Sequence, residues 1–167
     1  AMVTNNVLNG FRLLTYLTKR PPKHFFCVST DKAANPVNVM GASKKLMEEM
    51  VMAYANLFPA TTARFANVAF SNGSLPLGFL DRLRKRQAIA CPTGIRRFFV
   101  SPRESGEICL CAAVLGKSGE IFFPKLDPSR DMKTFDSILT DLYTELGLKP
   151  RLCKDEDEAR RITAEFR

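Results

Sequence analysis

The side chains with the most obvious chemical capacity stand together in one run, Thr30, Asp31 and Lys32. A hydroxyl, a carboxyl and an amine in neighbouring positions can orient, donate and accept protons, which is what general acid–base chemistry requires. The run directly follows residues 24–29 (HFFCVS), a short apolar segment that predicts a strand buried on both faces, as in a parallel sheet. In open α/β sheets ligands bind outside the carboxyl ends of the strands, so the run is expected at a binding edge.

A second chemical feature lies one segment later. Residues 41–56 are rich in Lys, Met, Leu and Glu and predict a helix. Met40 and Lys44 are four residues apart, so on a helix they share a face. Taken alone, an Asp-Lys pair after a strand is usually a solvated turn, and a helical lysine is usually a surface residue. A functional role for these residues therefore has to be supported by the neighbouring sequence.

Strand and helix signals alternate along the chain, which favours a layered α/β fold. We expect Thr4, Ser101 and Asp155 to cap helices and Gly147 to end one. No Gly-rich strand–turn–helix of the kind that holds a dinucleotide pyrophosphate occurs. The predicted helices span residues 4–19, 41–56, 78–86, 101–115, 133–146 and a short segment after 155, and the predicted strands span residues 24–29, 61–70, 89–91, 120–124 and 151–153.

Composition narrows the class of protein. The five cysteines are odd in number without a CxxC pair, and there is one histidine, so neither a disulfide framework nor a zinc site is expected and a reducing, cytoplasmic compartment fits best. The net charge of +8 is scattered, with no nucleic-acid-binding motif beside it. No apolar run is long enough for a membrane span, and the first residues do not read as a signal peptide. We therefore expect neither nucleic acid nor membrane as a partner.

Four segments together resemble one family. Residues 29–44 (STDKAANPVNVMGASK) are similar to the active-site stretch of the extended short-chain dehydrogenase/reductases, in the polysaccharide-biosynthesis branch that dehydrates UDP-N-acetylglucosamine. The other three follow the family pattern in the right order, so the resemblance covers nearly the whole chain. They are residues 63–76 (ARFANVAFSNGSLP), 94–107 (GIRRFFVSPRESGE) and 120–128 (EIFFPKLDP).

The resemblance implies a nucleotide-sugar 4,6-dehydratase. In that reaction the sugar C4 hydroxyl is oxidised by bound NAD or NADP, water is eliminated across C5 and C6, and the hydride returns to C6. Most relatives have Tyr where this chain has Met40, and a thioether cannot exchange a proton. The acid–base work is therefore assigned to Lys32 as the C5 base, Asp31 as the acid and Thr30 as a relay at C4. These roles need a lowered pKa for Lys32 and a raised pKa for Asp31, which burial and the charge of Lys44 are expected to supply.

The resemblance also implies binding residues. Lys44, Ser29 and Met40 are expected to contact the nicotinamide cofactor. Asn5 falls where related enzymes have an Asn that shapes the active-site helix. The expected contacts to the nucleotide sugar are Asn67, Ser74, Leu75 and Arg97, with Arg96 as the alternative to Arg97 at the diphosphate.

The predicted architecture is a partial doubly wound, Rossmann-like parallel sheet plus a small C-terminal α/β lobe that binds substrate. Residues 1–75 are expected to form the second half of the cofactor-binding domain and residues 76–167 the substrate lobe. Since the cofactor loop is missing, we expect the chain alone to be inactive, strand 24–29 to have an unpaired edge, and a homodimer or higher oligomer to form. The alternatives are a non-catalytic piece that binds sugar nucleotide weakly or serves only in dimerisation, and an epimerase of the same superfamily.

Overall fold

The computed structural model describes residues 1–165. These residues form two compact units. The first combines residues 1–66 with 103–125, and the second combines residues 67–102 with the chain from Leu126 onward. The expected division near residue 75 into cofactor and substrate regions concerns binding and stays a prediction. No helix of the described chain is long and apolar enough to cross a membrane.

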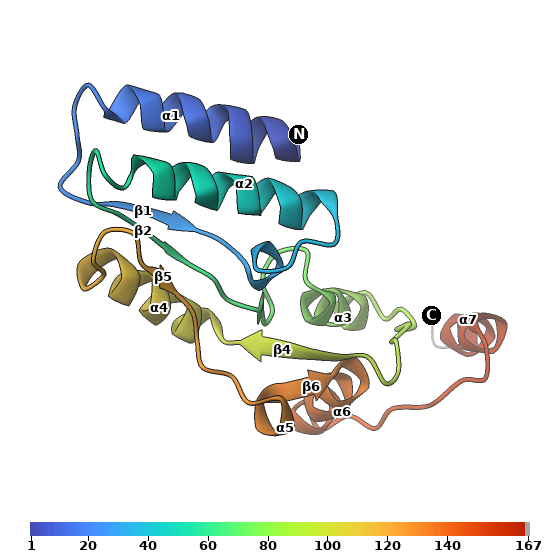
Figure 1. Ribbon diagram of the computed structural model, residues 1–167. Coiled ribbons are helices and arrows are strands. Elements are labelled where there is room, and N and C mark those ends of the chain that lie inside the picture. The colour runs from blue at the N-terminus through green and yellow to red at the C-terminus, as the bar shows by residue number, and fades with distance from the viewer. Residues whose placement is uncertain (166–167) are drawn as a thin grey trace. The chain divides into compact units, whose positions relative to one another are not determined.

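The first unit is built on a parallel sheet of β1 (Phe25–Val28), β2 (Ala60–Ala63) and β5 (Ile121–Phe122), in the order β1-β2-β5. Helices cover both faces: α1 (Gly10–Leu17) and α2 (Val39–Tyr54) lie on one side and α4 (Pro102–Val114) on the other (Figure 1). A π-helical turn, η1 (Thr4–Asn9), leads into α1. The α/β, Rossmann-like fold class is confirmed. Within the described residues β1 pairs only with β2, which confirms the predicted open edge.

The core of this unit lies between the two helices and the sheet. Leu14 of α1, Val51 of α2, and Phe58 and Ala60 before and within β2 are at most 3% exposed. The Phe25 ring meets Phe58 edge-on, with centroids 6.2 Å apart. Such a geometry adds about 0.5–1.5 kcal/mol to the burial of each aromatic pair. Packing of β1 against α1 and α2 thus fixes the strand that ends at Val28, two residues before Thr30.

The second unit has a small mixed sheet in the order β3-β4-β6. Strand β4 (Arg96–Val100) lies in the middle, parallel to β3 (Asn67–Val68) and antiparallel to β6 (Met132–Thr134). Phe99 of β4 packs edge-on against Phe135 of α6, with centroids 5.8 Å apart. The helices of this unit are α3 (Leu75–Arg84), α5 (Pro128–Asp131), α6 (Phe135–Glu145) and α7 (Glu156–Glu165).

Several predicted strands are wrong. The single strand predicted over residues 61–70 is two strands in different sheets, because pairing with β1 stops at Ala63 opposite Val28. Residues 96–100, expected to run into a turn, form the central strand β4. Residues 89–91 and 151–153 form no strand, and each segment stands beside a proline. The helix predicted from residue 133 starts at Phe135, because residues 132–134 pair with β4.

The predicted helix ends fare better. Asp155 caps α7, accepting the Glu158 amide at 2.8 Å, and Gly147 has a φ of +65° after α6, so both predictions are confirmed. Thr4 is not a cap, since the residue before it is already helical. Ser101 directly precedes α4. Instead of Gly78, α3 begins at Leu75, and Ser74 caps it by accepting the Leu77 amide at 3.3 Å.

Gly41, in the first turn of α2, packs against the turn that carries the acid–base residues. Asn38 caps α2 by accepting the Gly41 amide at 2.9 Å. A Cβ atom at Gly41 would stand 2.7 Å from the Lys32 carbonyl oxygen and 3.3 Å from Pro36. Only a residue without a side chain therefore allows α2 to begin against the Thr30–Lys32 backbone.

We predict opposite effects for alanine at two helical glycines. Gly41→Ala should destabilise the chain by about 1–3 kcal/mol, because the new methyl group collides with backbone. Gly106→Ala, on an exposed position of α4 with open space for a Cβ, should stabilise it by about 0.5–1 kcal/mol through helix propensity. Urea unfolding of both variants measures the difference. If both variants changed the free energy of unfolding equally and in the same direction, the close approach of Gly41 to the Lys32 carbonyl would not affect stability.

Candidate active site

The turn at the carboxyl end of β1 brings Thr30, Asp31 and Lys32 into direct contact. Thr30 has an extended backbone and caps a short 3-10 turn, η2 (Asp31–Ala33). Its hydroxyl donates to Asp31 Oδ1 at 2.8 Å, and Lys32 Nζ donates to the same oxygen at 3.3 Å. The side chains of Lys32 and Asp31 are 42% and 46% exposed, so the burial expected from the sequence is absent here. The cluster is a compact acid, base and hydroxyl open to solvent.

Lys44 reaches the same sheet edge from α2. Its ammonium group donates to the Val28 carbonyl at 3.1 Å, the last residue of β1. Met40 lies one turn earlier on the same helix face and is half-buried. The predicted spacing therefore places Lys44 beside the strand end that continues into Ser29 and Thr30. Its role toward a cofactor stays a prediction.

A buried ion pair lies beneath this edge. Glu48 of α2 is 1% exposed and accepts hydrogen bonds from two nitrogens of the Arg64 guanidinium, from Nε to Oε1 at 2.8 Å and from Nη2 to Oε2. Burial by itself raises the pKa of Glu48, but the hydrogen bonds and charge of Arg64 outweigh it and the pKa is lowered. The Ser29 hydroxyl is buried and helps to lower that pKa, but it makes no hydrogen bond of ordinary geometry to any described residue.

Sequence reasoning missed Glu48 and Arg64. Glu48 stands in a run of charged residues that looks like a solvated helix surface, and Arg64 lies inside the single strand predicted over residues 61–70. One signal was available: Glu48 is four residues after Lys44 and so shares the face that Lys44 directs toward the strand end. The i,i+4 spacing could have marked it as a residue of the same edge.

Cys27 is the thiol closest in sequence to the turn. Burial raises its pKa, and the positive charge of Lys44 opposes this only in part. Its sulfur lies 3.5 Å from that of Met47. Cys27 is thus a half-buried thiol whose surroundings disfavour the thiolate form.

Asn5 and Asn6 lie in the π-helical turn η1. The Asn5 side chain is exposed and accepts a long hydrogen bond from Asn9 at 3.5 Å. Asn6 instead donates to Ser43 Oγ at 3.0 Å, between Met40 and Lys44 on α2. Within the first unit, Asn6 is therefore the residue of this pair that touches the helix of the site, whereas the sequence pointed to Asn5.

The residues expected to bind substrate lie in the second unit. Arg97 is exposed on β4 and, among the described residues, its side chain donates to the Arg96 carbonyl alone, at 2.9 Å. Asn67 on β3 pairs with Phe99, two residues beyond Arg97, so Asn67 and Arg97 share one face of the sheet. Arg96, the alternative, lies on the opposite face and donates to the Pro128 carbonyl. Ser74 is half-buried as the α3 cap, and Leu75 is 37% exposed beside it.

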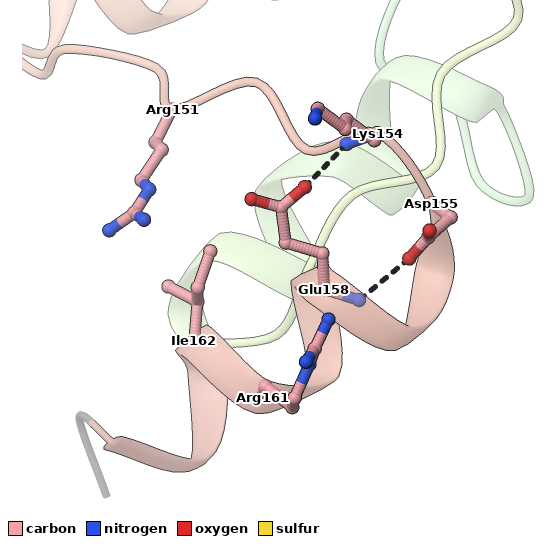
Figure 2. A pocket seen from close by; sticks show the side chains of 6 residues that line it. All are labelled: Arg151, Lys154, Asp155, Glu158, Arg161 and Ile162. Atoms are coloured by element: carbon pink, nitrogen blue, oxygen red, sulfur yellow. Dashed lines mark hydrogen bonds between the residues drawn. The ribbon is translucent and has the colours of Figure 1, made fainter.

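Two open hollows lie apart from these residues. One, of about 480 Å³, is lined by residues of the N-terminal turn including Asn5 and Asn6. The other, of about 420 Å³, is formed around α7 and mixes cations with the carboxylates that cap the helix (Figure 2). Neither is lined by the predicted catalytic residues. The hollow in Figure 2 is lined by Arg151, Lys154, Asp155, Glu158, Arg161 and Ile162.

Nearly the whole chain fits one family model. Residues 1–160 match the family described as polysaccharide biosynthesis protein. The chain belongs to this family. Its fold is that of the extended short-chain dehydrogenase/reductases, which confirms the superfamily predicted from the sequence.

Relatives of the polysaccharide-biosynthesis chain differ in name. A protein of Methanocaldococcus jannaschii, called an uncharacterized membrane protein, is 32% identical over 89% of this chain and 46% of its own length. A UDP-glucose 4-epimerase of Rickettsia canadensis is 30% identical over 84% of this chain and 43% of its own. The chain therefore spans about half the length of the curated relatives it matches.

A solved structure shares the fold. The dTDP-glucose 4,6-dehydratase of Bacillus anthracis, crystallised with NAD, superimposes with a TM-score of 0.76 and covers 98% of this chain and 62% of its own. The two sequences are 17% identical, so this likeness speaks for the fold alone.

We predict that Glu48→Gln destabilises the chain by about 3 kcal/mol or more at neutral pH, because it leaves the Arg64 charge without its buried partner. The pKa of Glu48 is lowered by folding, so its stabilisation is present above the ordinary value of 4.5 and is lost as pH falls through the lower folded value. The difference in unfolding free energy between the unchanged chain and Glu48→Gln should thus become smaller as the pH is lowered. Urea unfolding across pH measures this.

Glu49→Gln is the matched control. Its carboxylate is 61% exposed and pairs with Lys45 on the helix surface, so the change should be within about 0.5 kcal/mol. If Glu48→Gln behaved like Glu49→Gln, the buried pair would not stabilise the edge of the sheet.

Proposed function

We propose that this chain is part of a nucleotide-sugar 4,6-dehydratase acting on UDP-N-acetylglucosamine. The observation that carries the proposal is the Thr30–Asp31–Lys32 cluster at the carboxyl end of β1, with Met40 where a proton-transferring Tyr stands in most of the superfamily. Without a phenol at Met40, proton transfer has to come from this cluster.

The cluster suits an elimination across neighbouring carbons. Lys32 Nζ and Asp31 Oδ1 are 3.3 Å apart, so base and acid can face the C5 proton and the C6 hydroxyl together. A proton passing from Lys32 to Asp31 along that hydrogen bond creates the neutral amine and the neutral acid that the step needs. Covering both groups with substrate favours this neutral pair, because burying charge is costly. Lys32 then takes the C5 proton and Asp31 protonates the departing hydroxyl.

The residues expected to hold NAD or NADP fit that role in part. Lys44 presents an ammonium at the strand end beside Ser29, and Met40 offers an apolar surface on the same helix face. The chemistry that the bound nicotinamide supplies is acceptance of a hydride from C4 and its return to C6. The residues of this chain orient the ribose with Lys44 and hold the C4 hydroxyl with Thr30.

The substrate's nucleotide is assigned to the second unit. Arg97 and Asn67 share one face of the β3-β4-β6 sheet, and a guanidinium matches phosphate oxygens bidentately. Ser74 and Leu75 are assigned to the nucleotide pocket. The relatives named UDP-glucose 4-epimerase favour a uridine nucleotide and also a second candidate activity, epimerisation at C4.

Oligomerisation is proposed through the helices of the first unit. The outer face of η1 and α1 is apolar and exposed, with Phe11 at 50% and Tyr16 at 61%. If two copies packed these faces together, the apolar surface would be buried. The other exposed apolar residues of this segment are Met2, Val3, Leu8 and Leu13.

We predict a homodimer that Phe11→Glu disrupts, because a charge on that face cannot be buried without a partner. Sedimentation velocity should show the wild-type chain as a dimer and Phe11→Glu as a monomer. Leu110→Glu, on the exposed face of α4 at 64%, is the matched control and should leave the dimer intact. A monomeric wild type, or a dimer unaffected by Phe11→Glu, would refute the proposed interface.

The function is tested first by calorimetric titration with UDP-N-acetylglucosamine and, separately, NAD⁺. We expect the sugar nucleotide to bind and NAD⁺ to bind weakly or not at all, because the pyrophosphate-holding loop is not in this sequence. Failure to bind the sugar nucleotide would count against the proposal.

In a protein that joins these residues to a cofactor-binding half, the product should be a 4-keto-6-deoxy sugar. Lys32→Ala should lower kcat by about 100-fold or more. Lys45→Ala, a lysine paired with Glu49 on the helix surface, is the control with unchanged kcat. Recovery of only the C4 epimer would favour the epimerase, and full turnover by Lys32→Ala would remove Lys32 as the base.

A further inference from the structure

Strand β4 and strand β6 place two positive side chains directly opposite one another. In the antiparallel register Arg97 pairs with Lys133, one residue from the Arg96–Thr134 pair. Side chains at paired positions project from the same face with Cβ atoms about 4.5–5.5 Å apart. Like charges in this arrangement repel and destabilise the sheet. Both residues are exposed, so packing of the strand pair does not explain why two positive side chains stand at these positions.

No carboxylate of the described chain neutralises the pair. None of its ion pairs includes Arg97 or Lys133. The nearby acids are engaged elsewhere: Asp131 holds Arg130 and Asp136 accepts the Gly94 amide at 3.2 Å. Asn67, on the same face through its pairing with Phe99, donates to the Phe98 carbonyl, and no described residue donates to its amide oxygen. The face therefore offers two unneutralised cations and one polar amide.

We propose that Lys133 is a second phosphate-binding residue, and that Arg97 and Lys133 together clamp the diphosphate of the nucleotide. The inference rests on the proposed function, and it adds a residue that the sequence did not mark. A diphosphate places two anionic groups side by side, which matches two cations held at neighbouring strand positions. The guanidinium fixes one phosphate through paired hydrogen bonds, whereas the ammonium acts as a point charge on the other. The bound anion removes the repulsion between the two side chains.

The test uses calorimetry with UDP and UMP on the whole chain. Lys133→Met keeps the aliphatic stem and removes the charge, and it should weaken UDP binding about tenfold while changing UMP binding much less. Lys133→Arg keeps the charge and should retain UDP binding. Lys149→Met, an exposed lysine between α6 and α7 of the same unit, is the matched control with unchanged affinity.

A second readout needs no ligand. Because the like-charge pair is destabilising when empty, Lys133→Met should raise the ligand-free Tm by roughly 1–3 °C, and Lys149→Met should not. UDP affinity of Lys133→Met equal to wild type, an equal loss for UDP and UMP, or a wild type that binds neither UDP nor inorganic pyrophosphate would each overturn the inference. If wild type bound UDP and Lys133→Met lost affinity as predicted, but UDP-N-acetylglucosamine was not dehydrated, the phosphate-binding role of Arg97 and Lys133 would be supported and the proposed function would be wrong.

Discussion

The arrangement of the first unit depends on one buried ion pair. Glu48 is almost wholly removed from water, and a lone carboxylate there would be too costly to keep charged. Arg64 satisfies both of its oxygens and, because it follows β2, ties the middle of α2 to the carboxyl end of the sheet. With α2 held at that level, its first turn meets the Lys32 carbonyl at Gly41, and Lys44 reaches the end of β1. The geometry of the edge thus follows from an ion pair that lies beneath it.

The two units treat charge in opposite ways. In the first unit, Glu48, Arg64 and Lys44 all find protein partners, so the edge is organised before any ligand arrives. In the second unit, Arg97 and Lys133 face each other with their charges unneutralised among the described residues. Paired charges, as in the first unit, hold their side chains in place, and removing one partner costs stability. Two unneutralised cations, as in the second unit, are the arrangement that we propose an anion completes. The first unit therefore holds an edge that is organised in advance, and the second holds a face that we propose is completed by an anion.

Much of the first unit could be predicted from the sequence, and much of the second could not. Strand β1 was predictable because Phe25–Val28 is an uninterrupted apolar run, although the burial on both faces expected from that run is only partial and Val28 is 43% exposed. Strand β4 opens with two exposed arginines, and β3 has only two residues, so neither carries a recognisable period. The acid–base run was found because its three residues are adjacent in sequence. Glu48, Asn6 and Lys133 were missed because their partners, Arg64, Ser43 and Arg97, lie 16, 37 and 36 residues away, and only tertiary pairing brings them together.

The order of the segments has a consequence for how the chain folds during synthesis. The first unit is interrupted: β2 ends at Ala63, but its second neighbour β5 begins only at Ile121, after the ribosome has made residues 67–102 of the other unit. Until then β1, α2 and β2 form a local β-α-β arrangement whose β2 edge has no partner strand. Parallel pairing over such a separation is slow, because the ends of a long loop must first be brought together. The nascent chain therefore passes through a stage with strand edges open on both sides, when it is most exposed to pairing with a wrong neighbour.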